Sequence, residues 1–221
     1  MKIAVINETS AADRNKDIMT ALVGRGLEVI NAGMRRNGEP PELQYIHTGL
    51  LAALLINLKR VDLVVGGCGT GQGFLNAVVQ YPNIICGHIL NDLDAWLFAQ
   101  INAGNVISLA LNQGYGWAAD VNLKFIFDRY FSVRQGQGYP AHRSEPQAQS
   151  RQTLETISQA THRTMAEIIE MLPDNIVRPV LAYPGVRELL AVESIEDAAL
   201  KAALIKRYGE IEKVVVNGFT K

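Results

Sequence analysis

The stretch from Val61 to Phe74 reads VDLVVGGCGTGQGF, and it decides how the rest of the chain is interpreted. Its first half, Asp62–Gly66, is a short, apolar, β-branched run, which is typical of a strand buried on both faces of a parallel sheet. Its second half places glycines and a thiol, Cys68, directly after that strand. Ligands of open α/β sheets bind beyond the carboxyl ends of the strands. The stretch therefore predicts a buried strand that ends in a functional loop.

The same two signals alternate along the first part of the chain. Short apolar runs, each predicted to be a strand, lie at Lys2–Ile6, Glu28–Asn31, Asp62–Gly66, Ile84–His88 and Val106–Leu111. Segments with helical character follow them, at Ala12–Arg25, Ile46–Lys59, Phe74–Gln80, Asp92–Ala103 and Trp117–Tyr130. Strands that alternate with helices predict a doubly wound α/β sheet with right-handed crossovers.

The texture of the sequence changes after Tyr130. Residues 132–152 are polar and rich in glycine and proline, which predicts a loop and a boundary. We therefore expect an α/β domain over residues 1–143 and a helical C-terminal extension over residues 144–221. In the extension we predict a long helix at Thr153–Met171, a break at Pro173–Pro179, and shorter helices at Val186–Val192 and Ser194–Tyr208, the last begun by a capping box of Ser194 and Asp197.

The composition excludes several classes of protein. The 221 residues are 48% hydrophobic and 19% charged with a net charge of −1, an ordinary globular profile with no electrostatic argument for nucleic acid or an anionic membrane. The longest apolar run, Gly49–Leu58, is too short to span a bilayer. Two cysteines, Cys68 and Cys86, do not make a disulfide framework. We expect a cytoplasmic protein with no nucleic-acid or membrane partner.

The glycine-rich loop fits neither of two common phosphate-binding patterns. A dinucleotide fingerprint that starts at Gly67 needs glycine where Gln72 stands, and one that starts at Gly69 needs glycine where Phe74 stands. No Gly-Lys-Ser/Thr follows, so the loop is not a P-loop. Its amides at a helix start still favour an anion, and they favour a thiolate at Cys68 that serves as a proton acceptor. The alternative is that Cys68 is a small buried hydrophobe and the glycines only permit close packing.

Three segments together resemble one enzyme family. MKIAV at the start, GCGTGQG after the third predicted strand and INAGNVISLAL around the fifth are similar to the ribose-5-phosphate isomerase B / galactose-6-phosphate isomerase family, in order and spacing, over about residues 1–143. The resemblance implies a flavodoxin/Rossmann-like three-layer sandwich with a five-stranded parallel sheet. It implies an enzyme, usually dimeric or a dimer of dimers with the site built across the interface, that interconverts aldose and ketose phosphates through a cis-enediolate without a metal or another cofactor.

The resemblance also assigns roles to individual residues. Cys68 matches the base that moves the proton between C1 and C2, and Thr70 matches the threonine that assists. The amides from Gly69 to Gly73 would hold the developing oxyanion. Further residues stand at positions that line the sugar or bind the phosphate in the family, namely Glu8, Thr9, Tyr45, Gly69, Gly71, Gln72, Gly73, Asn102, His142 and Arg143. Arg143 matches a phosphate-binding arginine, Tyr139 stands where another is found, and Arg134 is expected to compensate.

The departures from the family pattern leave the substrate open. The family pair Asp-His is Glu8-Thr9 here, and the ring-opening histidine is replaced by Ile101. Either His47, His88 or His142 takes that role, or the substrate needs no ring opening. The alternatives to a ribose 5-phosphate or galactose 6-phosphate isomerase are an isomerase of a different sugar and a phosphosugar-binding protein with altered catalysis.

The other chemically distinctive residues have structural interpretations. Cys86 lies within the fourth predicted strand and is expected to be inert, and Trp96 and Trp117 are expected in the core or at an interface. His88 taken alone is expected to be a structural histidine. No spacing of His, Cys, Asp and Glu resembles a metal site.

Overall fold

The structure, a computed structural model, describes residues 1–218 and their side chains up to residue 213, so the last three residues of the predicted extension lie outside the described residues. It confirms the predicted five-stranded parallel sheet with helices on both faces. The strands are β1 (Lys2–Ile6), β2 (Glu28–Asn31), β3 (Leu63–Cys68), β4 (Cys86–Ile89) and β5 (Val106–Ala110), in the spatial order β2-β1-β3-β5-β4.

The central strand is β3, and all six of its residues are buried. It pairs in parallel with β1, where Val65 is opposite Val5, and with β5, where Val65 is opposite Ile107. Its unbroken apolar run is thus explained by two covered faces and two paired edges. The strand order reverses between β1 and β3. From β1 the chain passes to β2 on one side of the sheet, and from β3 it passes to β4 and β5 on the other side.

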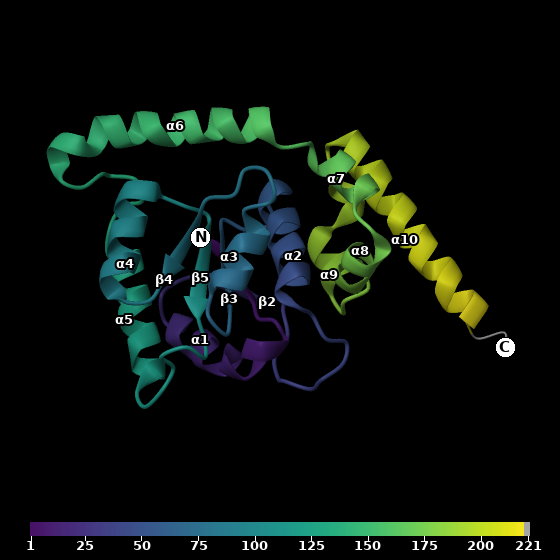
Figure 1. The fold of residues 1–221 in the computed structure, drawn as a ribbon, viewed down its shortest axis with the longest axis horizontal. Helices are drawn as coiled ribbons and strands as arrows, with labels where there is room; N and C mark the ends of the chain where they lie inside the picture. Colours follow the sequence, from purple (N-terminus) through teal and green to yellow (C-terminus); the bar gives the residue numbers. More distant parts are fainter. Residues whose placement is uncertain (219–221) are drawn as a thin grey trace.

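Helices cover the two faces of the sheet (Figure 1). The 3₁₀ helix η1 (Thr9–Arg14), α1 (Asn15–Leu22), α4 (Asp92–Leu97) with the π-helical turn η2 (Phe98–Asn102), and α5 (Ala119–Phe131) pack on one face. The helices α2 (Tyr45–Asn57) and α3 (Gln72–Val78) pack on the other. Each face has its own hydrophobic cluster, so the domain is a three-layer sandwich.

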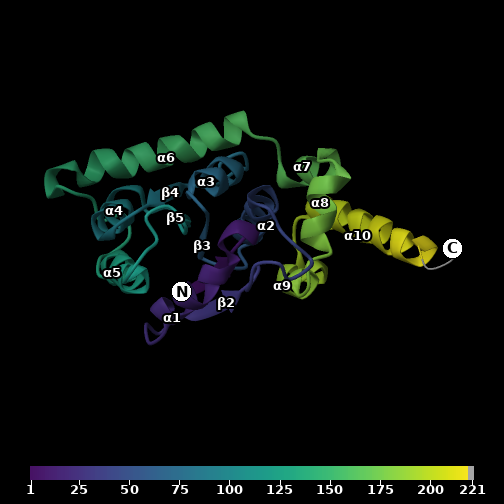
Figure 2. The same cartoon turned by 60° about the horizontal axis from the view of Figure 1, so that its bottom comes forward.

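The extension consists of helices, with bounds η3 (Ala141–Arg143), α6 (Ser144–Thr161), α7 (Met165–Met171), α8 (Asp174–Leu181), α9 (Val186–Leu190), η4 (Val192–Ser194) and α10 (Ala198–Gly218). Figure 1 shows α6 lying across the end of the sheet where the strands begin, and α7 to α10 gathered beside α2. In the turned view of Figure 2, α10 projects away from the α/β domain. No helix within residues 1–218 is both long and apolar enough to cross a membrane.

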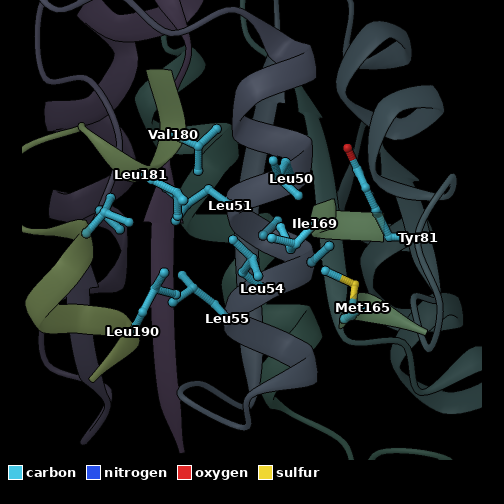
Figure 3. Packing of buried hydrophobic residues seen from close by; sticks show 14 of the residues in the cluster. Leu50, Leu51, Leu54, Leu55, Tyr81, Met165, Ile169, Val180, Leu181 and Leu190 are labelled. Atoms are coloured by element: carbon cyan, nitrogen blue, oxygen red, sulfur yellow. The ribbon is translucent and has the colours of Figure 1, made fainter. Parts of the chain in front are cut away.

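The outer side of α2 is covered by the extension. Leu50, Leu51, Leu54 and Leu55 are all inaccessible to solvent, and they belong to one cluster with apolar residues of α7, α8 and α9. Figure 3 shows these leucines facing Val180, Leu181, Leu190, Ile169 and Met165. A helix that is apolar all round must be buried all round. The sequence of α2 therefore requires the extension as a cover.

Several predicted boundaries in the extension are wrong. The polar segment predicted as a loop up to Gln152 is helical from Ser144, because Pro146 falls in the first turn, where no backbone N–H is needed. The predicted long helix is broken before Thr164, whose side chain and Glu167 form a capping box that begins α7. The capping box predicted at Ser194 is absent, since α10 begins at Ala198.

Two side chains show why the last prediction failed. The Asp197 carboxylate caps α10 by accepting from the amides of Ala199 and Leu200, each at 3.0 Å. Ser194 instead accepts a hydrogen bond at 2.9 Å from the guanidinium of Arg60, which lies in the α/β domain.

The segment predicted as a break, Pro173–Pro179, forms most of α8, although Pro179 lies inside that helix.

Candidate active site

Cys68 is the last residue of β3, and the glycine loop follows it at the carboxyl edge of the sheet. The loop lies next to the end of β1, where the strand order of the sheet reverses. This point of an open α/β sheet leaves a crevice because the two connections diverge from it. The structure thus places the thiol where the sequence predicts a functional loop.

Glycine is required at Gly71 by both conformation and space. Its φ is +76°, in the left-handed region that residues with a Cβ avoid. A Cβ at this position would lie 2.7 Å from His88 Nε2. The loop therefore closes tightly against β4 before α3 begins.

Cys68, Thr70 and Tyr45 meet around this loop. The Cys68 Sγ lies 4.0 Å from the Thr70 hydroxyl oxygen. A Cβ placed on Gly73 would lie 3.4 Å from that sulfur and 3.2 Å from the Tyr45 ring, so the ring and the thiol flank the same glycine. Cys68 is 6% exposed, while Thr70 and Tyr45 are exposed. The thiol borders the core on one side and the polar rim of the loop on the other.

Most amides of the glycine loop already donate within the protein. The N–H of Gly69 donates to Ser10 Oγ at 3.1 Å, that of Gly71 to the Cys68 carbonyl at 3.2 Å, and that of Gln72 to Thr70 Oγ1 at 3.3 Å. Within the part of the chain that the structure describes, the amides of Thr70 and Gly73 have no such acceptor. Only these two amides of the predicted set are free to bind an oxyanion.

The loop after β1 supplies a buried carboxylate. Glu8 is 2% exposed, and its carboxylate accepts a hydrogen bond from Ser10 Oγ. Ser10 in turn accepts from the Gly69 amide, and its carbonyl accepts from Asn112 Nδ2 at 2.7 Å. The neighbouring Thr9 hydroxyl lies 3.5 Å from Asn37 Oδ1. Glu8 is therefore connected to the glycine loop through one hydroxyl.

Ser10 and Asn112 were not among the predicted site residues. Each follows a strand closely, Ser10 after β1 and Asn112 after β5. Polar side chains just beyond the carboxyl ends of neighbouring parallel strands lie at one edge of the sheet. Applied to every predicted strand, that rule would have identified both residues from the sequence.

Four predicted site residues lie at the opposite edge of the sheet. Asn102 precedes β5, Arg134 follows α5, and His142 and Arg143 lie in η3 before α6. A helix that follows a strand returns the chain to the edge where the strands begin. Arg151 of α6 anchors this region by donating to the carbonyls of Ile101, at 2.8 Å, and Gly136, at 3.0 Å. The fold does not bring these four residues to Cys68 within one chain.

The histidines proposed for ring opening have different environments. His47 is buried, with Nδ1 accepting from the Gln44 amide at 3.0 Å and Nε2 donating to the Asn175 carbonyl at 3.1 Å. His142 lies at the far edge of the sheet. His88 alone reaches the glycine loop, where its Nε2 lies 2.9 Å from the Thr70 carbonyl.

The second cysteine differs from the first. Burial raises the pKa of the Cys86 thiol to about 12, so this thiol is neutral at physiological pH. No metal-binding group of three or more His, Cys, Asp and Glu side chains occurs among the described residues. Cys86 is thus a matched chemical control for Cys68.

This α/β sandwich is the fold of sugar isomerases of known structure. The sequence profile of the Ribose/Galactose Isomerase family matches residues 3–141, and the chain belongs to that family. No curated protein sequence gives a significant match.

Solved structures divide into two lengths. A 4-deoxy-L-threo-5-hexosulose-uronate ketol-isomerase complexed with a tartrate is 32% identical with a TM-score of 0.86, and the match covers 95% of this chain and 100% of that one. A ribose-5-phosphate isomerase from Vibrio parahaemolyticus is 34% identical with a TM-score of 0.84, over 96% and 98%. A ribose-5-phosphate isomerase B from Clostridium thermocellum is 25% identical with a TM-score of 0.59, over 72% and 99%. The first two match the extension as well as the sandwich.

Proposed function

We propose that the chain is an aldose–ketose isomerase in which Cys68 is the base. The thiolate removes the proton from C2 of the open-chain aldose. The C–H electron pair forms the C1–C2 double bond of a cis-enediolate while the π pair of the C1 carbonyl moves onto O1 as the oxyanion. A proton then moves from the C2 hydroxyl to O1, assisted by Thr70. The Cys68 thiol returns its proton to C1, which leaves the ketone at C2. The observation that carries this proposal is the Thr70 hydroxyl 4.0 Å from the Cys68 sulfur on a loop with free amides.

The two free amides support the charged intermediate. The Thr70 and Gly73 N–H groups belong to the loop that follows Cys68 and would donate to the enediolate oxygen, which is where negative charge develops. Glu8, Tyr45 and Gln72 surround the same loop and would bind hydroxyl groups of the sugar. Donors fixed by the fold need no reorganisation during the reaction.

Two substrate classes are candidates. A sugar phosphate of the ribose 5-phosphate or galactose 6-phosphate type is the class implied by the family, with His142 and Arg143 on the phosphate and Arg134 beside them. An unphosphorylated sugar acid is the second class, because a hexosulose-uronate ketol-isomerase matches the chain over its full length. A ribose-5-phosphate isomerase matches over the same length, so the extension does not choose between the two classes. Thr9 and Ile101, where the family has histidines, are consistent with this second class.

We propose that the active unit is a homodimer. Asn102, His142 and Arg143 would reach Cys68 only from the amino edge of a second subunit. The outer surface of α4 and α5 supports such an interface, because it exposes large apolar side chains. They are Leu93 of α4 and Val121 and Phe125 of α5, with Leu90 and Trp117 in the loops that precede these helices.

Proton exchange tests the reaction directly. The protein is incubated in heavy water with a panel of pentose and hexose phosphates and of sugar acids, and deuterium at C1 or C2 is measured. We expect exchange with at least one ketose–aldose pair, a loss of about 10²- to 10⁴-fold in Cys68→Ala, and wild-type rates in Cys86→Ala. Treatment with EDTA should leave the rate unchanged, since the proposed steps use no metal.

The contrary results are equally specific. Full exchange in Cys68→Ala would remove the thiol from the mechanism. Binding of a phosphosugar with no exchange across the panel would identify the binding protein instead.

A further inference from the structure

Two side chains from neighbouring strands hold consecutive carbonyls of the glycine loop. His88 of β4 lies with Nε2 2.9 Å from the Thr70 carbonyl oxygen, and Ser108 of β5 donates to the Gly71 carbonyl at 2.5 Å. His88 and Ser108 are paired in the parallel register of β4 and β5, so their side chains leave the sheet side by side. Neither strand contributes any other side-chain hydrogen bond to this loop.

These bonds complete the fixation of the loop backbone. In the peptide group between Thr70 and Gly71, His88 binds the carbonyl and the Cys68 carbonyl binds the N–H. In the next peptide group, Ser108 binds the carbonyl and Thr70 Oγ1 binds the N–H of Gln72. With both ends of each peptide group held, neither peptide plane is free to rotate. The hydroxyl of Thr70 is thereby kept beside the Cys68 sulfur.

The packing around the glycine loop leaves no space for another arrangement of its backbone. Ser108 is fully buried, and a Cβ on Gly71 would lie 2.8 Å from His88 Cδ2. The imidazole thus lies directly against the loop rather than across open solvent. Its Nε2 is occupied by the Thr70 carbonyl, so this nitrogen of the ring is bound to the loop.

We propose that His88 and Ser108 are positioning residues for the isomerisation. They fix the Thr70 and Gly71 carbonyls so that the Thr70 hydroxyl lies beside Cys68, and neither side chain touches the substrate. The proposal rests on the proposed function of Cys68 and Thr70. It also separates His88 from a role in ring opening, which would require the ring to exchange a proton with the sugar.

Substitution by glutamine distinguishes positioning from proton transfer. A Gln side chain carries an N–H donor at a reach similar to that of His Nε2, but it does not titrate. We expect His88→Leu to lower kcat about 10- to 100-fold with KM within about threefold, as misplacement of a catalytic group does. We expect His88→Gln to recover most of kcat. His162→Leu, a change in the extension, is the control and should match the wild type.

Ser108→Ala provides a second test that changes little volume. It should lower kcat in the same direction, and the double variant His88→Leu/Ser108→Ala should lose less than the product of the two single losses, because both act on one loop. Thermal unfolding and circular dichroism establish that each variant is folded. If His88→Leu does not fold, His88→Gln and Ser108→Ala carry the test.

The results separate this inference from the proposed function. A folded His88→Leu with wild-type kcat, or a His88→Gln as impaired as His88→Leu, overturns the positioning role while Cys68→Ala is still inactive. Independent, multiplicative losses in the double variant also overturn it. Exchange that survives in Cys68→Ala instead overturns the function on which the inference rests.

Discussion

At the scale of single residues, two glycines of the glycine loop differ in how strongly the structure requires glycine. Gly71 has a positive φ and no space for a Cβ beside His88. Gly69 has neither constraint, because a Cβ there would lie 3.4 Å or more from its neighbours, the amide of Asn112 first. The two residues are both glycine in the sequence, but the structure requires glycine only at Gly71.

This difference predicts that substitution by alanine has a large effect at Gly71 and a small effect at Gly69. Gly71→Ala forces a side chain into the left-handed region and against the imidazole, so it should lower the free energy of unfolding by about 1–3 kcal/mol and abolish proton exchange. Gly69→Ala should fold with nearly wild-type stability. Urea unfolding and the exchange assay measure both. Equal effects of the two substitutions would contradict the conformational argument.

The residues around Cys68 were predictable to a limited depth. Cys68, Thr70 and Tyr45 were identified because each matches a family position, and the structure places them together. Ser10 and Asn112 were missed, since their hydrogen bonds join loops about a hundred residues apart in sequence. Partners of that kind follow from the register of the strands and not from any local pattern.

At the scale of elements, α8 contains a proline that would be expected to end it. Pro179 has no N–H to donate to the carbonyl of Asn175, four residues earlier in the helix. That carbonyl accepts from His47 Nε2 at 3.1 Å instead. The Nδ1 of the same ring accepts from the Gln44 amide at the start of α2, which fixes the proton on Nε2. One imidazole therefore replaces the missing bond and joins two helices.

A pair of substitutions tests this compensation. His47→Leu removes the hydrogen bond to the Asn175 carbonyl, so it should lower the free energy of unfolding by about 0.5–1.5 kcal/mol. In a Pro179→Ala background the restored N–H can bind that carbonyl, and the same histidine substitution should cost measurably less. Urea unfolding of the four proteins in the cycle gives the coupling. A coupling of zero would mean that His47 does not compensate for the proline.

The errors in the predicted elements have two origins. The residues from Ser144 were interpreted as part of a loop because they continue a polar stretch rich in glycine and proline, and α6 has no buried residue to mark it as a helix. The capping box of Thr164 and Glu167 that divides the predicted long helix was present in the sequence and was overlooked. The first error reflects a helix held by a few side-chain anchors such as Arg151, which no periodicity records.

At the scale of the whole molecule, the separation of the predicted site residues is the main finding. The carboxyl edge of the sheet carries Cys68, Thr70 and Glu8, and the amino edge carries Asn102 and the η3 turn. A single chain does not bridge the two edges. The homodimer proposed above would, and it predicts that assembly and activity are lost together.

Phe125→Asp tests that link. The ring of Phe125 is 55% exposed in the apolar surface over α4 and α5, and a carboxylate there would have to be desolvated in an interface. We expect a monomer in sedimentation equilibrium with at least tenfold slower proton exchange. Ile205→Asp, a similarly exposed position on α10, should change neither. A monomeric Phe125→Asp with full activity would place the complete site within one chain.

The sequence by itself determined the parallel sheet and the helices that alternate with its strands. It also determined the glycine loop and the thiol at the end of β3. These follow from local periodicity and from a motif of contiguous residues, which are properties of neighbours along the chain. Only the tertiary structure decided which loop amides are free, what His47 and His88 bind, and that the predicted site is divided between two edges. Those outcomes depend on contacts between strands and helices distant in sequence, and the free energy of such contacts is set by packing that no local pattern specifies.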